Sequence, residues 1–288
     1  MSKLAERPVE VADGYRAGRT LPVRVELVRQ LKRRRTLVMG GILFALPIVL
    51  LVAFQVGGDP GGANDRTNLM DTATVSGANF AAVNLFASAG FLLVIPVALF
   101  CGDTVASEAS WSSLRYLLAA PVPRGRLLWS KLAVGLSLSL AALVLLPVVA
   151  FAVGTAAYGW GPLQLPTGGA LDTGTAAQRL LIVVAYIMVS QLVTAALAFW
   201  LSTRTDAPLG AVGGAVFLTI IGNVLDEVTA LGDWRHFLPA HWQYAWLDAV
   251  RPQLEWSDMI QGTSLSVTYA LVLFALAFRG FARKDIVS

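Results

Sequence analysis

Charged residues, cysteine and histidine are all scarce in this chain. Only 14% of its 288 residues are charged, and Cys101 is the single cysteine, so no disulfide can form within the chain. The only two histidines, His236 and His241, have Pro239 between them and lack the spacing of a helical ligand pair. We therefore expect neither a disulfide framework nor a metal site.

A nucleotide-binding loop is also missing from the sequence. None of the four lysines follows a glycine, so the Gly-x4-Gly-Lys-Ser/Thr pattern of a phosphate loop does not occur. The long apolar stretches hold no ionisable residue, which leaves no acid, base or activated nucleophile inside them. We expect no catalytic residue and no cofactor in this chain, and we rank an intramembrane enzyme last among its functions.

Apolar residues are abundant instead. They make up 56% of the chain, and the mean hydropathy is +0.65, outside the range of ordinary soluble domains. The formal net charge is +4, but the basic residues flank apolar stretches, which favours a membrane surface over nucleic acid as their partner. The sequence predicts an all-α membrane protein that contacts lipid and binds no nucleic acid.

Six apolar stretches approach the length of about 20 residues that a helix needs to cross the hydrocarbon core. We place the spans at residues 36–54, 80–101, 132–154, 180–201, 208–225 and 262–278. Arg33, Arg34 and Arg35 come directly before the first span with no cleavage site, which predicts a retained anchor. Because Pro208 suits a helix start, residues 202–207 should form a tight hairpin.

The spans divide the chain into four parts. We expect a polar N-terminus over 1–20, an amphipathic helix at the membrane interface over 21–35, a six-helix domain over 36–278 and a tail over 279–288. Within the domain, the aromatic-rich residues 225–261 should lie at the outer headgroup level. The alternative for residues 21–35 is a solvated basic tail.

Basic residues are distributed unequally between the loops. The N-terminus, residues 102–131, residues 202–207 and the tail together carry 18 Lys and Arg against 8 Asp and Glu. The loops on the other side carry 4 Lys and Arg against 10 Asp and Glu. Because basic residues near span ends stay on the cytoplasmic side, we predict that both termini are cytoplasmic.

Polar side chains are rare within the predicted spans. Asn84, Gln191 and Asn223 place amides there, and each needs a partner inside the protein. These amides either line a substrate path or only join helices through hydrogen bonds. Pro96 also falls inside the second span, where we expect it to kink the helix.

The cytoplasmic segment after the second span has the pattern of a short amphipathic helix. We expect this helix over residues 104–120, with Thr104 as its N-cap. Its apolar face and charged flanks comprise Glu108, Trp111, Leu114, Arg115 and Leu118. Such a face either binds another protein or packs on the inner helix ends of the chain itself.

These features together resemble the type-2 ATP-binding-cassette permeases, a family common among bacterial exporters. The likeness rests on the run from Glu108 through Leu114-Arg115 to Lys131, on six spans with both ends on one side, and on the closing Phe281-Ala-Arg-Lys284. The resemblance implies an exporter transmembrane domain in which residues 21–35 are a connecting helix.

The resemblance also implies partners and a function. Residues 104–120 would be a coupling helix seated on a separate cassette ATPase, which holds ATP and Mg, and a second permease, identical or homologous, would complete the complex. The expected function is export of an amphipathic or hydrophobic drug, lipid or peptide across the bacterial cytoplasmic membrane. The chain would not be an enzyme by itself. The alternative is a membrane assembly or signalling scaffold that moves no solute.

Overall fold

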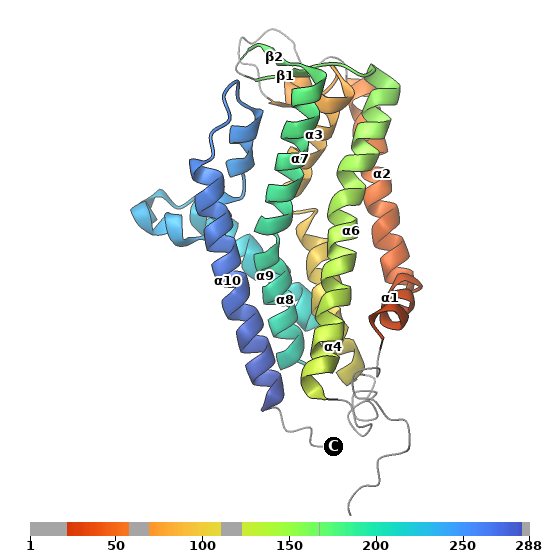
Figure 1. The fold of residues 1–288 in the computed structure, drawn as a ribbon, viewed down its shortest axis with the longest axis vertical. Coiled ribbons are helices and arrows are strands. Elements are labelled where there is room, and N and C mark those ends of the chain that lie inside the picture. The colour runs from red at the N-terminus through yellow and green to blue at the C-terminus, as the bar shows by residue number, and fades with distance from the viewer. Residues whose placement is uncertain (1–21, 58–68, 111–122, 167, 284–288) are drawn as a thin grey trace, which may run out of the picture.

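The computed structural model describes residues 22–57, 69–110, 123–166 and 168–283, and nearly all of the regular structure in them is helical (Figure 1). The helices of the bundle are α1 (Val23–Leu31), α2 (Arg34–Gly57), α3 (Gly77–Ala89), α4 (Val94–Ser110), α6 (Arg124–Tyr158), α7 (Thr173–Ser190), α8 (Leu192–Arg204), α9 (Pro208–Asp226) and α10 (Ser257–Ala282). Four 3-10 turns, η2 (Leu69–Thr72), η3 (Thr229–Phe237), η4 (Pro239–Trp242) and η5 (Ala245–Val250), and a hairpin of β1 (Leu163–Gln164) and β2 (Ala170–Leu171) complete it.

The prediction of an all-α membrane protein is confirmed. Among the described residues, five stretches are long and apolar enough to cross a membrane, namely α2, α6, α7 with α8, α9 and α10. The number is six if α3 and α4 are counted as one bent span. Each predicted span falls within one of these stretches, and most helices extend a turn or more beyond the predicted ends because polar residues continue them outside the apolar core.

The second predicted span is not one continuous helix. It is divided at residues 90–93 into α3 and α4, which meet at an angle of 54°. Pro96 stands in the first turn of α4, where no intrahelical N–H bond is needed, so it favours a new helix start. The expected bend in this span is therefore present, but it is a break just before Pro96 and not a kink within one continuous helix.

The expected hairpin after the fourth span is present. α8 continues through Arg204, and α9 begins at Pro208, with Pro208 in the first turn. The ends of α4, α8 and α10 and the starts of α2, α6 and α9 gather at the lower end of the bundle in Figure 1, beside α1. The structure therefore brings the helix ends that border the predicted basic segments to one end of the molecule.

The core lies around α4, which packs against α6, α8 and α9. A Cβ atom on Gly102 would lie 3.1 Å from the Val212 side chain and 3.4 Å from that of Ala198, so this glycine allows α8 and α9 to approach α4 closely. By contrast, only 11% of the apolar window of α2, and 11% of that of α9, is buried. These two helices present most of their apolar surface outward.

Candidate functional site

The first candidate site surrounds the break between α3 and α4. A broken helix leaves backbone carbonyls without intrahelical donors, and in hydrocarbon each needs another partner. The Gln191 side chain donates to the Ala89 carbonyl at 3.3 Å, and the Asn223 side chain donates to the Gly90 carbonyl at 3.3 Å. Two amides that the sequence singled out are thus brought together at one feature of the backbone.

Asn84 is placed differently from the other two amides. Its side-chain N–H donates to the Phe80 carbonyl one turn earlier in α3, at 2.8 Å, and the residue is fully buried. Within the described chain, Asn84 Oδ1 and Gln191 Oε1 are buried acceptors with no hydrogen-bond partner. Asn84 therefore joins α3 to itself, whereas Gln191 faces a cavity.

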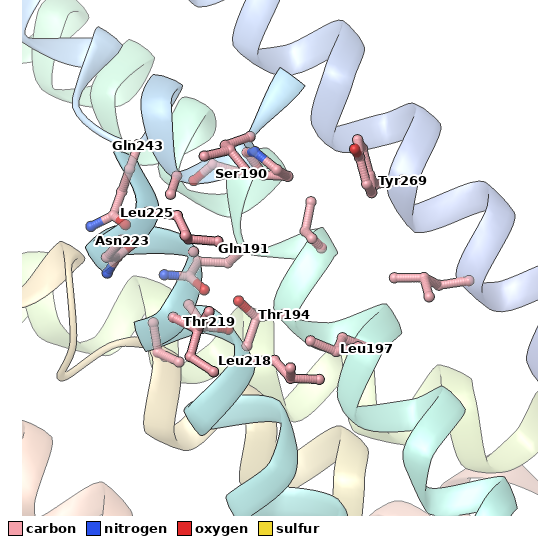
Figure 2. Close-up of a pocket in the computed structure, with 18 residues that line it drawn as sticks. Ser190, Gln191, Thr194, Leu197, Leu218, Thr219, Asn223, Leu225, Gln243 and Tyr269 are labelled. Atoms are coloured by element: carbon pink, nitrogen blue, oxygen red, sulfur yellow. The ribbon is translucent and has the colours of Figure 1, made fainter. Parts of the chain in front are cut away.

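That cavity is a groove of about 380 Å³ beside the break (Figure 2). Helices α8, α9 and α10, the end of α7, the start of α4 and the η4 region form its walls. Its polar lining residues are Ser190, Gln191, Thr194, Thr219, Asn223, Gln243 and Tyr269, and the others are apolar or glycine. No lining residue is charged. The groove therefore suits an amphipathic molecule that offers hydrogen-bonding groups and an apolar body.

The aromatic segment 225–261 helps to close this groove. The Tyr186 hydroxyl donates to the Trp242 carbonyl at 2.6 Å, and Tyr269 of α10 donates to the Phe237 carbonyl at 3.1 Å. Trp242 and Trp246 are buried, whereas Trp234 is 73% exposed. Part of the predicted aromatic belt thus serves as internal packing, and part faces outward beside α10 (Figure 1).

The second candidate site is a cluster of charges at the lower end of the bundle, which we call the ionic cluster. Its buried members are Glu26, Asp103, Glu108 and Lys131, and its partly exposed members are Arg29, Arg33 and Arg35. Lys131 of α6 donates to Glu26 of α1 at 2.8 Å and also binds Glu108 of α4. Arg29 binds both of these carboxylates. The lysine and both glutamates are less than 10% exposed. One cation therefore ties three helices together.

Asp103 forms the second half of the ionic cluster. It accepts from Arg33 at 3.0 Å and also pairs with Arg35 of α2. Asp103 lies on α4 just over one turn before Glu108, so both carboxylates on this helix face basic residues from the N-terminal part of the chain. The cluster satisfies charges that would otherwise be costly to bury.

The pKa of Glu26 reflects this arrangement. Burial alone would raise the pKa, but hydrogen bonds from Arg29 and Lys131 and the charge of Lys131 outweigh burial and lower the pKa of the carboxyl to about 2. Glu26 is therefore ionised at neutral pH. Its charge holds α1 against the bundle.

The ionic cluster was missed from the sequence, and α1 shows why. The predicted interfacial helix over 21–35 forms as Val23–Leu31, but it buries polar Glu26 and Gln30 and exposes Val23, Val25, Val28 and Leu31. The polar face meets the bundle, and the apolar face is left for lipid. The spacing of Glu26 and Gln30, four residues apart and away from the apolar arc, was the available signal.

The predicted coupling segment begins differently from the expectation. Thr104 lies inside α4, which starts ten residues earlier, so the N-cap at Thr104 was wrong. The Thr104 hydroxyl donates to the Cys101 carbonyl within the helix. Glu108 is buried in the ionic cluster, where it pairs with Lys131. Trp111, Leu114, Arg115 and Leu118 lie outside the described residues.

The helices define a multi-span, all-helical membrane protein. Residues 67–287 match the family described as "Protein of unknown function (DUF2705)", and the chain belongs to that family. The matched region begins after α2, and it includes both helices of the break and all helices that line the groove. No curated protein matches the chain.

Proposed function

We propose that the chain is the permease subunit of an ATP-driven exporter in the bacterial cytoplasmic membrane. The observation that carries this proposal is the path of α4. Val94, its first residue, lines the groove, and Glu108, near its end, lies in the ionic cluster. α4 has 17 residues, and at a rise of about 1.5 Å per residue the 14 steps from Val94 to Glu108 place the two sites about 21 Å apart along this helix.

In this proposal α4 transmits the conformational change that ATP hydrolysis causes to the groove. α4 ends at Ser110, directly before the residues we assign to the docking face, Trp111, Leu114 and Leu118. In this proposal a cassette ATPase that binds ATP and Mg holds that face, with Arg115 at its rim. A movement of the ATPase then displaces the end of α4, and the helix transmits the displacement to the break.

Glu108 has a different role from the rest of the docking face. Its carboxylate binds Lys131 and Arg29, so it fixes the helix end from which the docking face emerges. Lys131 sits two turns into α6, on the other side of the docking segment. The ionic cluster thus holds Glu108 and Lys131, the residues before and after the docking segment, against α1. A displacement of the docking segment is therefore transmitted to the bundle.

The composition of the groove supports a substrate class. An uncharged lining with amides and hydroxyls beside apolar walls fits an amphipathic molecule such as a drug, a lipid or an apolar peptide. Gln191 Oε1 offers a buried acceptor that a substrate donor would satisfy. A second permease, identical or homologous, completes the complex in this proposal, with α2 and α9 offering their outward faces.

Binding of the ATPase tests the proposal. The chain would be coexpressed with the cassette ATPase encoded beside its gene, and ATPase retained on the purified chain would be measured. Truncating an aromatic contact at the centre of an interface costs about 2 kcal/mol, so Trp111→Ala should weaken binding by about thirtyfold. Leu114→Asp should abolish it.

The control is Trp256→Ala, an exposed tryptophan at the other end of the molecule, which should bind the ATPase as the wild type does. Both cytoplasmic variants must remain monodisperse and keep the wild-type helix content. Full ATPase binding by Trp111→Ala and Leu114→Asp would contradict the docking face. A neighbourhood without any cassette ATPase gene would count against the exporter itself.

A further inference from the structure

Three arginines converge where α8 and α10 end side by side at the lower end of the bundle (Figure 1). Arg204 is the last residue of α8, Arg279 stands in the last turn of α10, and Arg283 is the C-cap of α10. Together with Thr203, Leu276 and Gly280 they line a groove of about 530 Å³. We call this groove the arginine groove.

The position of Arg204 is fixed by its neighbours. Its guanidinium carbon lies 5.8 Å from the centre of the Trp200 ring, one turn earlier in α8. A Cβ atom on Gly280 would come within 3.2 Å of Nη2 and 3.3 Å of Cζ and Nε of this arginine. Gly280, which lies between Arg279 and Arg283 in the sequence, therefore lets the Arg204 guanidinium lie against α10.

These three charges lack the compensation that other basic residues at this end have. The cations of the ionic cluster all bind carboxylates, whereas Arg204, Arg279 and Arg283 form no ion pair with any described residue. The carbonyl ends of α8 and α10 offset part of the repulsion. Three like charges around one groove still favour a bound anion.

The surface next to the arginine groove is apolar. Leu276 lines the groove and is 42% exposed, and Val272, one turn further into the span, is 54% exposed. An acidic protein segment would match the charge of the groove but not the apolar surface beside it. A phospholipid matches both parts, because its phosphate needs the guanidiniums and its acyl chain covers the apolar side of α10.

We propose that the arginine groove binds an anionic phospholipid. The phosphate lies between Arg204, Arg279 and Arg283, and one acyl chain lies along Leu276 and Val272. Arginine suits this role because its planar fork of donors matches phosphate oxygens in pairs. The assignment does not depend on the exporter proposal, since it needs only a membrane around α10.

Native mass spectrometry of the full-length chain would test this site. The protein in detergent would be titrated with phosphatidylglycerol, with phosphatidylcholine as the uncharged reference, and retained lipids counted. Each basic residue contributes about fivefold to the affinity for anionic lipid, so Arg204→Gln, Arg279→Gln and Arg283→Gln together should weaken phosphatidylglycerol binding about a hundredfold. Binding of phosphatidylcholine should not change.

A second variant separates the groove from its charge. Gly280→Leu keeps all three arginines but places a side chain where the Arg204 guanidinium lies, so it should also lose the tightly retained lipid. The matched control removes three exposed basic residues from the same end of the molecule, as Arg24→Gln, Lys32→Gln and Arg34→Gln. This control should retain phosphatidylglycerol as the wild type does.

Each other outcome would overturn the proposal. Equal loss in the control triple would mean a diffuse surface attraction without a site. Displacement of the lipid by millimolar glycerol phosphate would mean a site for free anions, and unchanged lipid retention by the arginine triple would mean no site at all. Unchanged retention together with loss of the bound ATPase would assign the arginines to a protein partner.

Discussion

Replacing Lys131 with Met removes the cation on which the ionic cluster depends. Two buried carboxylates, Glu26 and Glu108, then lose Lys131 and still share Arg29, whose side chain is 46% exposed. Removing one partner of a buried ion pair typically costs about 3–5 kcal/mol of unfolding free energy. Because Arg29 still binds both carboxylates, we expect a loss near the lower limit, about 3 kcal/mol.

The assay is reversible unfolding of the purified chain in detergent micelles titrated with dodecyl sulfate. Lys131→Met combined with Glu108→Gln removes one buried charge of each sign, so the pair should recover about half of the lost free energy or more. Arg24→Gln is the control, because Arg24 is an exposed residue of α1 outside the ionic cluster, and it should cost less than about 1 kcal/mol. A cost for Lys131→Met as small as that of the control would refute the reasoning.

Three further predictions follow from the same contacts. The Glu26 contribution is complete above its unfolded pKa of 4.5 and is lost as the pH falls toward about 2, so cleavage of α1 by an acid-active protease should rise over that interval and not between pH 5 and 8. Asn223→Leu should cost about 1 kcal/mol of unfolding free energy and lower the affinity of the groove for amphipathic fluorescent dyes, whereas Asn84→Leu should leave dye binding unchanged. In intact cells an impermeant thiol reagent should label Gln253→Cys and spare Ala207→Cys, and the reverse pattern would invert the predicted orientation.

Length and composition were enough to predict the spans. An apolar run of about 20 residues without charge has few alternatives to a membrane helix, so all six predicted spans fall on helices, with the second divided in two. The break at residues 90–93 could not be predicted in the same way. Those residues are Gly-Phe-Leu-Leu, which continue the apolar pattern. The carbonyls of Ala89 and Gly90 at the break accept from Gln191 and Asn223, which are distant in the sequence.

The two candidate sites were predictable to different degrees. An amide in a span needs a partner, so Gln191 and Asn223 could be singled out from the sequence, although their shared target could not. The ionic cluster depends on residues far apart in the chain, since Lys131 meets Glu26 across 105 positions and Glu108 across 23. In the sequence, each of these three residues resembles a surface charge near the end of a span. Only the fold brings them together.

ATP-driven movement of solute tests the central claim most directly. The chain would be reconstituted with its cassette ATPase in lipid vesicles, and uptake of a fluorescent phospholipid analogue, a labelled apolar peptide and a hydrophobic dye would be followed after adding ATP and Mg. The exporter account predicts ATP-dependent movement of at least one probe, lost in Trp111→Ala and kept in Trp256→Ala. A complex that binds and hydrolyses ATP but moves none of the probes would contradict the account and favour a membrane scaffold.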